Sequence, residues 1–147
     1  MGRVPDFAPY RHPLTDPFWQ ASADGLVALP SCGVCGCWQW YPLAGVACHP
    51  EADQVWRTVP GEGSIFTFTR VERAFLPSGG EPPYTVALVE LDATPGVRLV
   101  TVLVGPGSDE PAIGDRVRLA PTKFDTHTLA TFEIVARRTG DGEERSR

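Results

Sequence analysis

The sequence predicts a mainly β protein made of a short N-terminal helix, a small cysteine-bearing ribbon and a five-stranded barrel. Two observations support this prediction. Four cysteines fall within 17 residues, from Cys32 to Cys48, and from about residue 61 onward five apolar or alternating segments follow without a helical pattern. We therefore expect four regions along the chain: an arm with a helix (1–27), a ribbon (28–58), a barrel (59–138) and a disordered polar tail (139–147).

The segment TDPFWQASADG, residues 15–25, has the features of a short helix. Thr15 or Asp16 can act as the N-cap, Pro17 suits the first helical position, and Gly25 can end the helix. A helix of this length is marginal in water when isolated. We therefore expect it to pack on the rest of the domain or on a partner.

The cysteines that follow are spaced for a metal site. Cys32 and Cys35 form a CxxC pair, which presents two thiols from one tight turn, and Cys48 follows after a loop of 12 residues. In a reducing compartment such a cluster indicates metal or redox chemistry rather than disulfides. We expect a structural zinc ion in a rubredoxin-like zinc ribbon. The fourth ligand is open among three residues, Cys37 and the alternatives His49 and Glu51.

Two other interpretations of the ribbon remain open. The ribbon could fold without metal, with Trp38, Trp40 and Tyr41 filling the space of the ion. The CxxC pair could also be redox-active, but such pairs usually lie where a strand meets a helix. Here residues 38–42, WQWYP, alternate well enough to form a short strand instead. We expect two or three small strands around residues 32–51.

The second half of the chain predicts five strands separated by turn-rich loops. The segments are rich in β-branched and aromatic residues or almost wholly apolar, as strands of a small β domain are. They cover residues 63–73, 84–91, 97–104, 115–121 and 129–137. Five strands of this length suit a closed or partly closed barrel of the OB-fold type, and a five-stranded sandwich is the alternative.

Aromatic residues are concentrated in the helix and the ribbon, which have little interior in which to bury them. Tryptophan and tyrosine are enriched at protein interfaces, so some of these side chains are expected to face a partner. The candidates are Phe18, Trp19, Trp38, Trp40 and Tyr41.

Arginine is the chain's main cation and several arginines fall on the barrel strands. Arg70 and Arg73 are candidates to contact the phosphates of a nucleotide-like group, since the guanidinium forks to phosphate oxygens. The alternative is that they belong to a solvated strand face.

Charge and motifs exclude several function classes. The net charge of −5 disfavours a protein that grips phosphate backbones. No stretch approaches the roughly 20 apolar residues of a membrane span, and the N-terminus lacks the apolar run of a signal peptide, so a cytoplasmic protein is expected.

The sequence contains no nucleophile elbow, P-loop or dinucleotide fingerprint. His127, beside Asp125, reads as a loop histidine rather than a catalytic group, and we name no catalytic residue.

In order and spacing, these segments resemble a known group of proteins. The chain carries DPFW in the helix, CGVCG in the ribbon, and then GEGSIFTFTRV, PPYTVALVELD, VRLVTVLV and IGDRVRL. Over residues 13–137 this layout is similar to the zinc-ribbon plus OB-fold accessory proteins that pair with thiolase-superfamily acyl-CoA enzymes. In that family the ribbon cysteines correspond to Cys32, Cys35 and Cys48, and the fourth cysteine position is Glu51 here.

The resemblance implies a role in an assembly rather than a solitary enzyme. Such proteins stabilise a thiolase-like catalytic subunit of the retro-aldolase, thiolase or acyltransferase type, and help to shape its acyl-CoA site. Arg70 and Arg73 would then be candidate contacts to CoA phosphates. Two alternatives remain: a free-standing acyl-CoA-binding protein, and an OB-fold protein that binds single-stranded nucleic acid.

Overall fold

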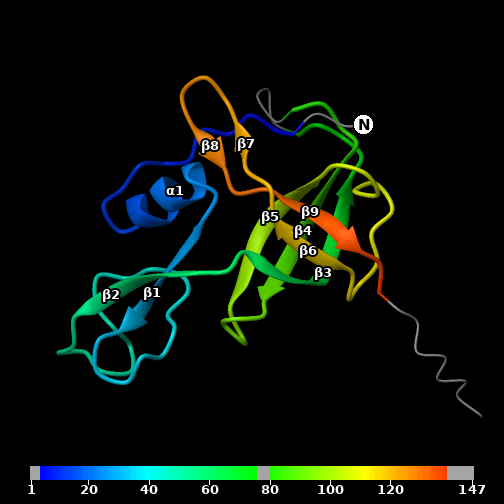
Figure 1. The fold of residues 1–147 in the computed structure, drawn as a ribbon. Coiled ribbons are helices and arrows are strands. Elements are labelled where there is room, and N and C mark those ends of the chain that lie inside the picture. The colour runs from blue at the N-terminus through cyan, green and yellow to red at the C-terminus, as the bar shows by residue number, and fades with distance from the viewer. Residues whose placement is uncertain (1–3, 76–79, 139–147) are drawn as a thin grey trace, which may run out of the picture.

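A computed structural model describes residues 4–75 and 80–138, and in it the predicted fold class is confirmed. The helix α1 (Asp16–Ala23) is followed by a two-stranded ribbon of β1 (Val27–Cys32) and β2 (Gln54–Val59), and then by the barrel (Figure 1). The predicted tail lies outside the described residues. No helix in the described part of the chain has the length and apolar character needed to cross a membrane.

The helix forms where the capping residues predict it. Thr15 is the N-cap, although its side chain makes no capping bond, and Pro17 lies in the first turn. The helix ends at Ala23 with Asp24 as its C-cap, and Gly25 follows with a φ of 76°, which only glycine adopts without strain. On its inner side Phe18 is buried, which anchors this short helix to the core.

Five long strands close into the barrel. They are β3 (Glu62–Val71), β4 (Tyr84–Leu91), β5 (Arg98–Val104), β6 (Arg116–Leu119) and β9 (Phe132–Ala136). The order around the barrel is β3-β4-β5-β9-β6, with β6 returning to β3; the β5–β9 pair is parallel and the others are antiparallel. Because the barrel is closed, its sheet has no free edges, and the structure is therefore an OB-fold barrel and not the alternative sandwich. A small hairpin, β7 (Thr122–Lys123) and β8 (Thr128–Leu129), interrupts the barrel before β9.

One hydrophobic core joins the barrel to the start of the ribbon. Strand β4 alternates half-buried and buried residues along its whole length, as a strand with one inward face should. All six residues of β1 are buried, and Val27 and Leu29 belong to the same core as Ile65 and Phe132 inside the barrel. The ribbon is therefore anchored to the barrel by its first strand, while the loop between β1 and β2 extends to one side (Figure 1).

The strand predicted at residues 38–42 does not form. Trp38 makes a single bridge with Ser31, and the strand that pairs with β1 is β2, which follows the last cysteine. The physical reason lies in Gln39. Its side-chain amide donates to the carbonyl of Gly45 at 2.7 Å and accepts from the amide of Ala47 at 2.8 Å, so the segment is tied into a loop instead of a ladder.

Candidate metal centre

A tight turn at the end of β1 positions the first two cysteines. The amide of Cys32 donates to the carbonyl of Cys37 at 2.8 Å, and the amide of Gly36 donates to the carbonyl of Cys32 at 2.9 Å. Gly36 has a φ of 74°, which lets the chain reverse there. The amide of Val34 points at Cys32 Sγ, 3.4 Å away. An amide donating to sulfur stabilises the thiolate, the form that binds metal.

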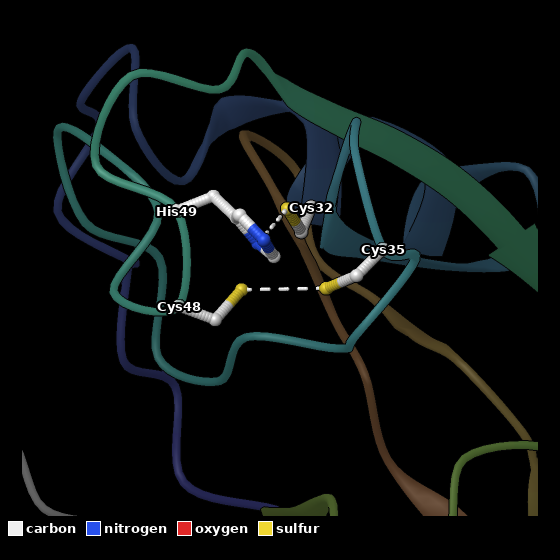
Figure 2. A group of neighbouring side chains, drawn as sticks. All are labelled: Cys32, Cys35, Cys48 and His49. Carbon is white, nitrogen blue, oxygen red and sulfur yellow. Dashed lines mark hydrogen bonds between the residues drawn. The ribbon is translucent and has the colours of Figure 1, made fainter.

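Four side chains from two segments converge on one point. Cys32 and Cys35 come from the turn after β1, and Cys48 and His49 come from the loop before β2. Their ligand atoms all lie within 4.8 Å of one another, and Figure 2 shows the side chains pointing toward a common centre. Cys32 is 2% exposed, whereas the other three are exposed, so the group is fixed to the core on one side and open to solvent on the other.

The spacing of these atoms fits a tetrahedral zinc site. Zinc binds sulfur at about 2.3 Å and imidazole nitrogen at about 2.0–2.1 Å. In a tetrahedron those bond lengths separate two sulfurs by about 3.8 Å and a sulfur from a nitrogen by about 3.6 Å. The structure has Cys35 Sγ 3.5 Å from Cys48 Sγ and Cys32 Sγ 3.4 Å from His49 Nδ1. The donors are thus already near the positions that a single ion requires.

The acidity of the thiols follows from their neighbours. The pKa of Cys35 is lowered to about 7, chiefly by a backbone hydrogen bond from Cys37. The pKa of Cys32 is also lowered, chiefly by a backbone hydrogen bond from Cys35. In contrast, desolvation and the neighbouring cysteines raise the pKa of Cys48 to about 12. Without a cation, the cluster can hold some but not all of its thiols as thiolates, as expected where negative charges crowd together.

The structure separates the candidates for the fourth ligand. His49, one of the alternatives, lies in the group of four, and Cys37 and Glu51 do not. Cys37 is exposed, and its thiol lies near that of Cys35 without joining the group of four. Glu51 is exposed in the loop beyond the group.

Arg57 of β2 supports the turn, and no sequence pattern singles this residue out. Its guanidinium stacks over Trp38, 4.1 Å from the ring centroid, and donates to the carbonyl of Gly36 at 2.9 Å and to Ser31 Oγ at 3.0 Å. These contacts join residues 21 and 26 positions apart. They hold the turn that carries Cys35 from the side of β2, as a group that supports metal ligands does.

The predicted partner-facing aromatic residues divide by exposure. Phe18 is 7% exposed and packs in the core, where its ring contacts Trp19 and Trp40. The three tryptophans are partly buried against the same core, and Tyr41 is 60% exposed. The aromatic cluster therefore joins the helix to the ribbon, and of its members Tyr41 reaches furthest into solvent.

The predicted phosphate contacts are placed on one side of the barrel, away from the cysteines. Arg70 pairs with Glu72 at 2.6 Å and donates to the carbonyl of Asp109 at 2.8 Å, so its guanidinium is already engaged. Arg73 follows β3 and is exposed.

His127, which the sequence predicts to be a loop histidine, pairs with Asp6 of the arm at 3.0 Å, and its ring stacks on Phe124. That pairing ties the arm to the β7–β8 hairpin.

Comparisons with known proteins agree with this architecture. Residues 56–121 match the sequence model of the ChsH2 C-terminal OB-fold domain. A solved structure described as an Ltp2–ChsH2(DUF35) aldolase contains a chain 27% identical to this one, with a TM-score of 0.76. The match covers 86% of this chain and 98% of that chain. No curated protein matches.

A second solved structure supports the fold alone. It is a DUF35-family protein of unknown function from Sulfolobus solfataricus, 12% identical, with a TM-score of 0.56. The match covers 85% of this chain and 87% of that one. Together with the sequence match, these likenesses confirm the resemblance read from the sequence: the chain is similar to the OB-fold accessory proteins of the ChsH2 (DUF35) type.

Proposed function

We propose that the protein is a non-catalytic accessory subunit of a thiolase-superfamily acyl-CoA enzyme that forms or breaks carbon–carbon or acyl bonds. The observation that carries the proposal is the likeness, over almost the whole of the matched chain, to ChsH2 in an Ltp2–ChsH2 aldolase. In this role the catalytic subunit carries the chemistry, and acyl-CoA reaches the assembly through it.

The metal site supports a structural role for the ribbon. Cys32, Cys35, Cys48 and His49 would hold one zinc ion. A bound zinc would cross-link the two segments of the ribbon. Because four protein side chains fill a tetrahedral site, no position is left for substrate, which is typical of structural rather than catalytic zinc.

The ribbon also carries exposed apolar side chains that fit a docking surface. Val34, Tyr41 and Leu43 are 69%, 60% and 55% exposed, and all three lie in the loop that the metal site would organise. Tyr41 also lines a hollow of about 590 Å³, together with Trp40 on the ribbon and Pro95 and Val97 before β5. Apolar groups gathered next to a hollow are a common feature of protein interfaces. We infer that this surface contacts the catalytic subunit.

Co-expression of the full chain with the thiolase-superfamily proteins of the same organism tests the proposal. We expect one of them to co-purify in a fixed ratio, and Tyr41→Ser combined with Leu43→Ser to reduce recovery of the complex at least tenfold. Ile113→Ser is the matched control, because Ile113 is 54% exposed and lies in the loop between β5 and β6, outside the ribbon. Thermal unfolding should show that both variants remain folded.

Two results would contradict the proposal. One is a chain that binds none of these proteins. The other is turnover of an acyl-CoA thioester by the isolated chain that is lost on changing one of its own residues, for example Cys37→Ala. Such turnover would favour the alternative of a free-standing acyl-CoA protein.

A further inference from the structure

An apolar cavity of about 270 Å³ lies outside the barrel, between α1, the N-terminal arm and the strands β4 and β5. Figure 1 shows α1 beside β8, with the arm running past the β7–β8 hairpin. Phe18 and Trp19 of the helix and Val86 and Val100 of the sheet line the cavity. It is separate from the cysteine cluster and from the hollow beside the ribbon.

The cavity exists because the outer face of this part of the barrel is apolar. An antiparallel strand with one wet face usually alternates apolar and polar residues. Here the residues that face outward include Val86, Leu88, Val100 and Val102, and Val100 is 58% exposed. The helix and arm cover only part of this face, so that apolar side chains remain uncovered.

The two threonine hydroxyls in the cavity wall are already satisfied. Thr101 Oγ1 donates to the carbonyl of Ala130 at 2.8 Å, and Thr131 Oγ1 donates to the carbonyl of Ala120 at 2.5 Å. They have little left to offer a polar ligand or an ordered water, which needs two or more polar partners. With these hydroxyls engaged and most of the other lining side chains apolar, the wall favours a hydrocarbon.

A second hollow adjoins the first and has a different character. It measures about 530 Å³ and shares Phe7 and Tyr84 with the apolar cavity, so the two meet at these side chains. Its wall carries Arg70, Glu72 and Arg73. Arg70 is neutralised by Glu72, whereas Arg73 makes no hydrogen bond or ion pair with any described residue. The wall of the second hollow thus has one positive charge free for a ligand.

We propose that the two hollows form one binding site for an anionic amphiphile, with its hydrocarbon tail in the apolar cavity and its anionic head at Arg73. A cavity of about 150 Å³ holds benzene, so 270 Å³ accommodates a tail of about ten carbon atoms. The head can be a carboxylate or a phosphate, since a guanidinium binds both. The site does not depend on the accessory role proposed above.

Titration calorimetry of the full chain tests this site with decanoate, decyl phosphate, hexanoate and decanol, all below the concentrations at which they form micelles. We expect saturable binding of the ten-carbon anions at one site per chain. Removing each methylene should weaken binding about fourfold, because burial of a methylene is worth about 0.8 kcal/mol. The anion that binds more tightly, decanoate or decyl phosphate, identifies the head group that the second hollow prefers.

Variants separate the tail from the head. Ala130→Leu fills the cavity and should weaken binding of decanoate and decanol at least tenfold. Arg73→Gln should weaken decanoate and decyl phosphate about three- to tenfold and leave decanol unchanged. Arg118→Gln is the matched control, since Arg118 pairs with Glu133 and lines neither hollow, and it should change the binding of none of these ligands.

The outcomes that would overturn the proposal are equally defined. They are the absence of saturable binding, binding that Ala130→Leu leaves intact, or equal effects of Arg73→Gln and Arg118→Gln. If Ala130→Leu prevents folding, Val100→Gln provides the same test, because Val100 is exposed on the outer face and outside the core.

Discussion

In the barrel, β4 and β5 bury every second side chain, and one continuous core holds the strands in position. In the ribbon, the 21 residues between β1 and β2 follow a different rule: all of them are described, and Val46 is the one buried hydrophobic residue among them. What organises this loop is the group of three cysteines and His49, together with the bonds of Gln39 and Arg57. A segment too short to build a core can be held by ligand atoms converging on one point.

This comparison predicts that core and ligand substitutions have separable effects. The two regions share β1, which the barrel core buries completely, but they do not share the residues beyond Cys32. Damage to the core should therefore unfold the whole chain. Damage to the cysteine cluster should release the loop and leave the barrel folded.

The largest effect is expected for Phe132→Ala. Phe132 is fully buried on β9, and removing a buried aromatic side chain typically lowers the free energy of unfolding by about 3–5 kcal/mol. Urea denaturation measures the change. Val135→Ala on the same strand is the control, because Val135 is 48% exposed and should cost less than about 1 kcal/mol. Equal losses for the two variants would show that β9 is not held by the core as described.

The next effect concerns the metal. Cys48→Ser removes a ligand and should weaken metal binding by more than about 100-fold, beyond the usual effect of changing a group that only supports a ligand. Titration with cobalt(II) reports this through the absorption of a tetrahedral thiolate site. His49→Ala should behave like Cys48→Ser, while Cys37→Ser should keep the wild-type spectrum. Loss of the spectrum in Cys37→Ser alone would restore Cys37 as the fourth ligand.

A smaller effect is expected at Asp115, a buried acid in the barrel. Burial opposes its ionisation, but backbone hydrogen bonds from Arg138 and Ala112 and the Arg137 guanidinium outweigh burial and lower its pKa. The ionised acid therefore stabilises the fold above the unfolded pKa of about 3.9, and this contribution is lost as the pH falls through the lower folded value.

Asp115→Asn should lower stability at pH 7 by about 1–3 kcal/mol, since one oxygen that accepts hydrogen bonds becomes a donor. Urea denaturation across pH 2–7 should show a flatter acid limb for the variant than for the wild type. Identical acid limbs would mean that Asp115 does not supply this dependence.

The smallest effect is expected for Arg57→Ala, which leaves all four ligand atoms in place. Removing the guanidinium that donates to Gly36 should weaken metal binding about tenfold, at the low end for supporting groups. Competition with a chelating dye measures the affinity. Arg57→Lys should recover part of it through charge, but not the stacking on Trp38. No change in Arg57→Ala would show that the turn is rigid without it.

Regular patterns made much of the fold predictable. The helix follows from Pro17 and Gly25, and the barrel strands follow from alternation, because both signals are local. The strand β2 was missed, and a strand was predicted instead at residues 38–42, where Trp38 makes a single bridge to Ser31 while Ser31 also pairs with Val55 of β2. The two-residue strands of the β7–β8 hairpin are too short to leave a pattern.

The cysteine cluster was predictable in part, because the spacing of cysteines is a local signal. The CxxC pair and Cys48 stand out by spacing, whereas the choice between Cys37 and His49 depends on the direction in which the turn leaves β1. The dipeptide Cys48–His49 was the available signal for the observed group. The contacts of Arg57 join residues 21 and 26 positions apart, and no local pattern encodes them.

Hydrogen exchange of the chain, alone and in complex with the thiolase-superfamily protein that co-purifies with it, tests the central claim most directly. We predict that the complex protects amides between residues 33 and 53, around the ligand cluster and Tyr41, and leaves the interior strands β4 and β5 unchanged. Protection confined to the barrel, with the ribbon loop exchanging as fast as in the free chain, would contradict the claim that the ribbon is the surface that docks.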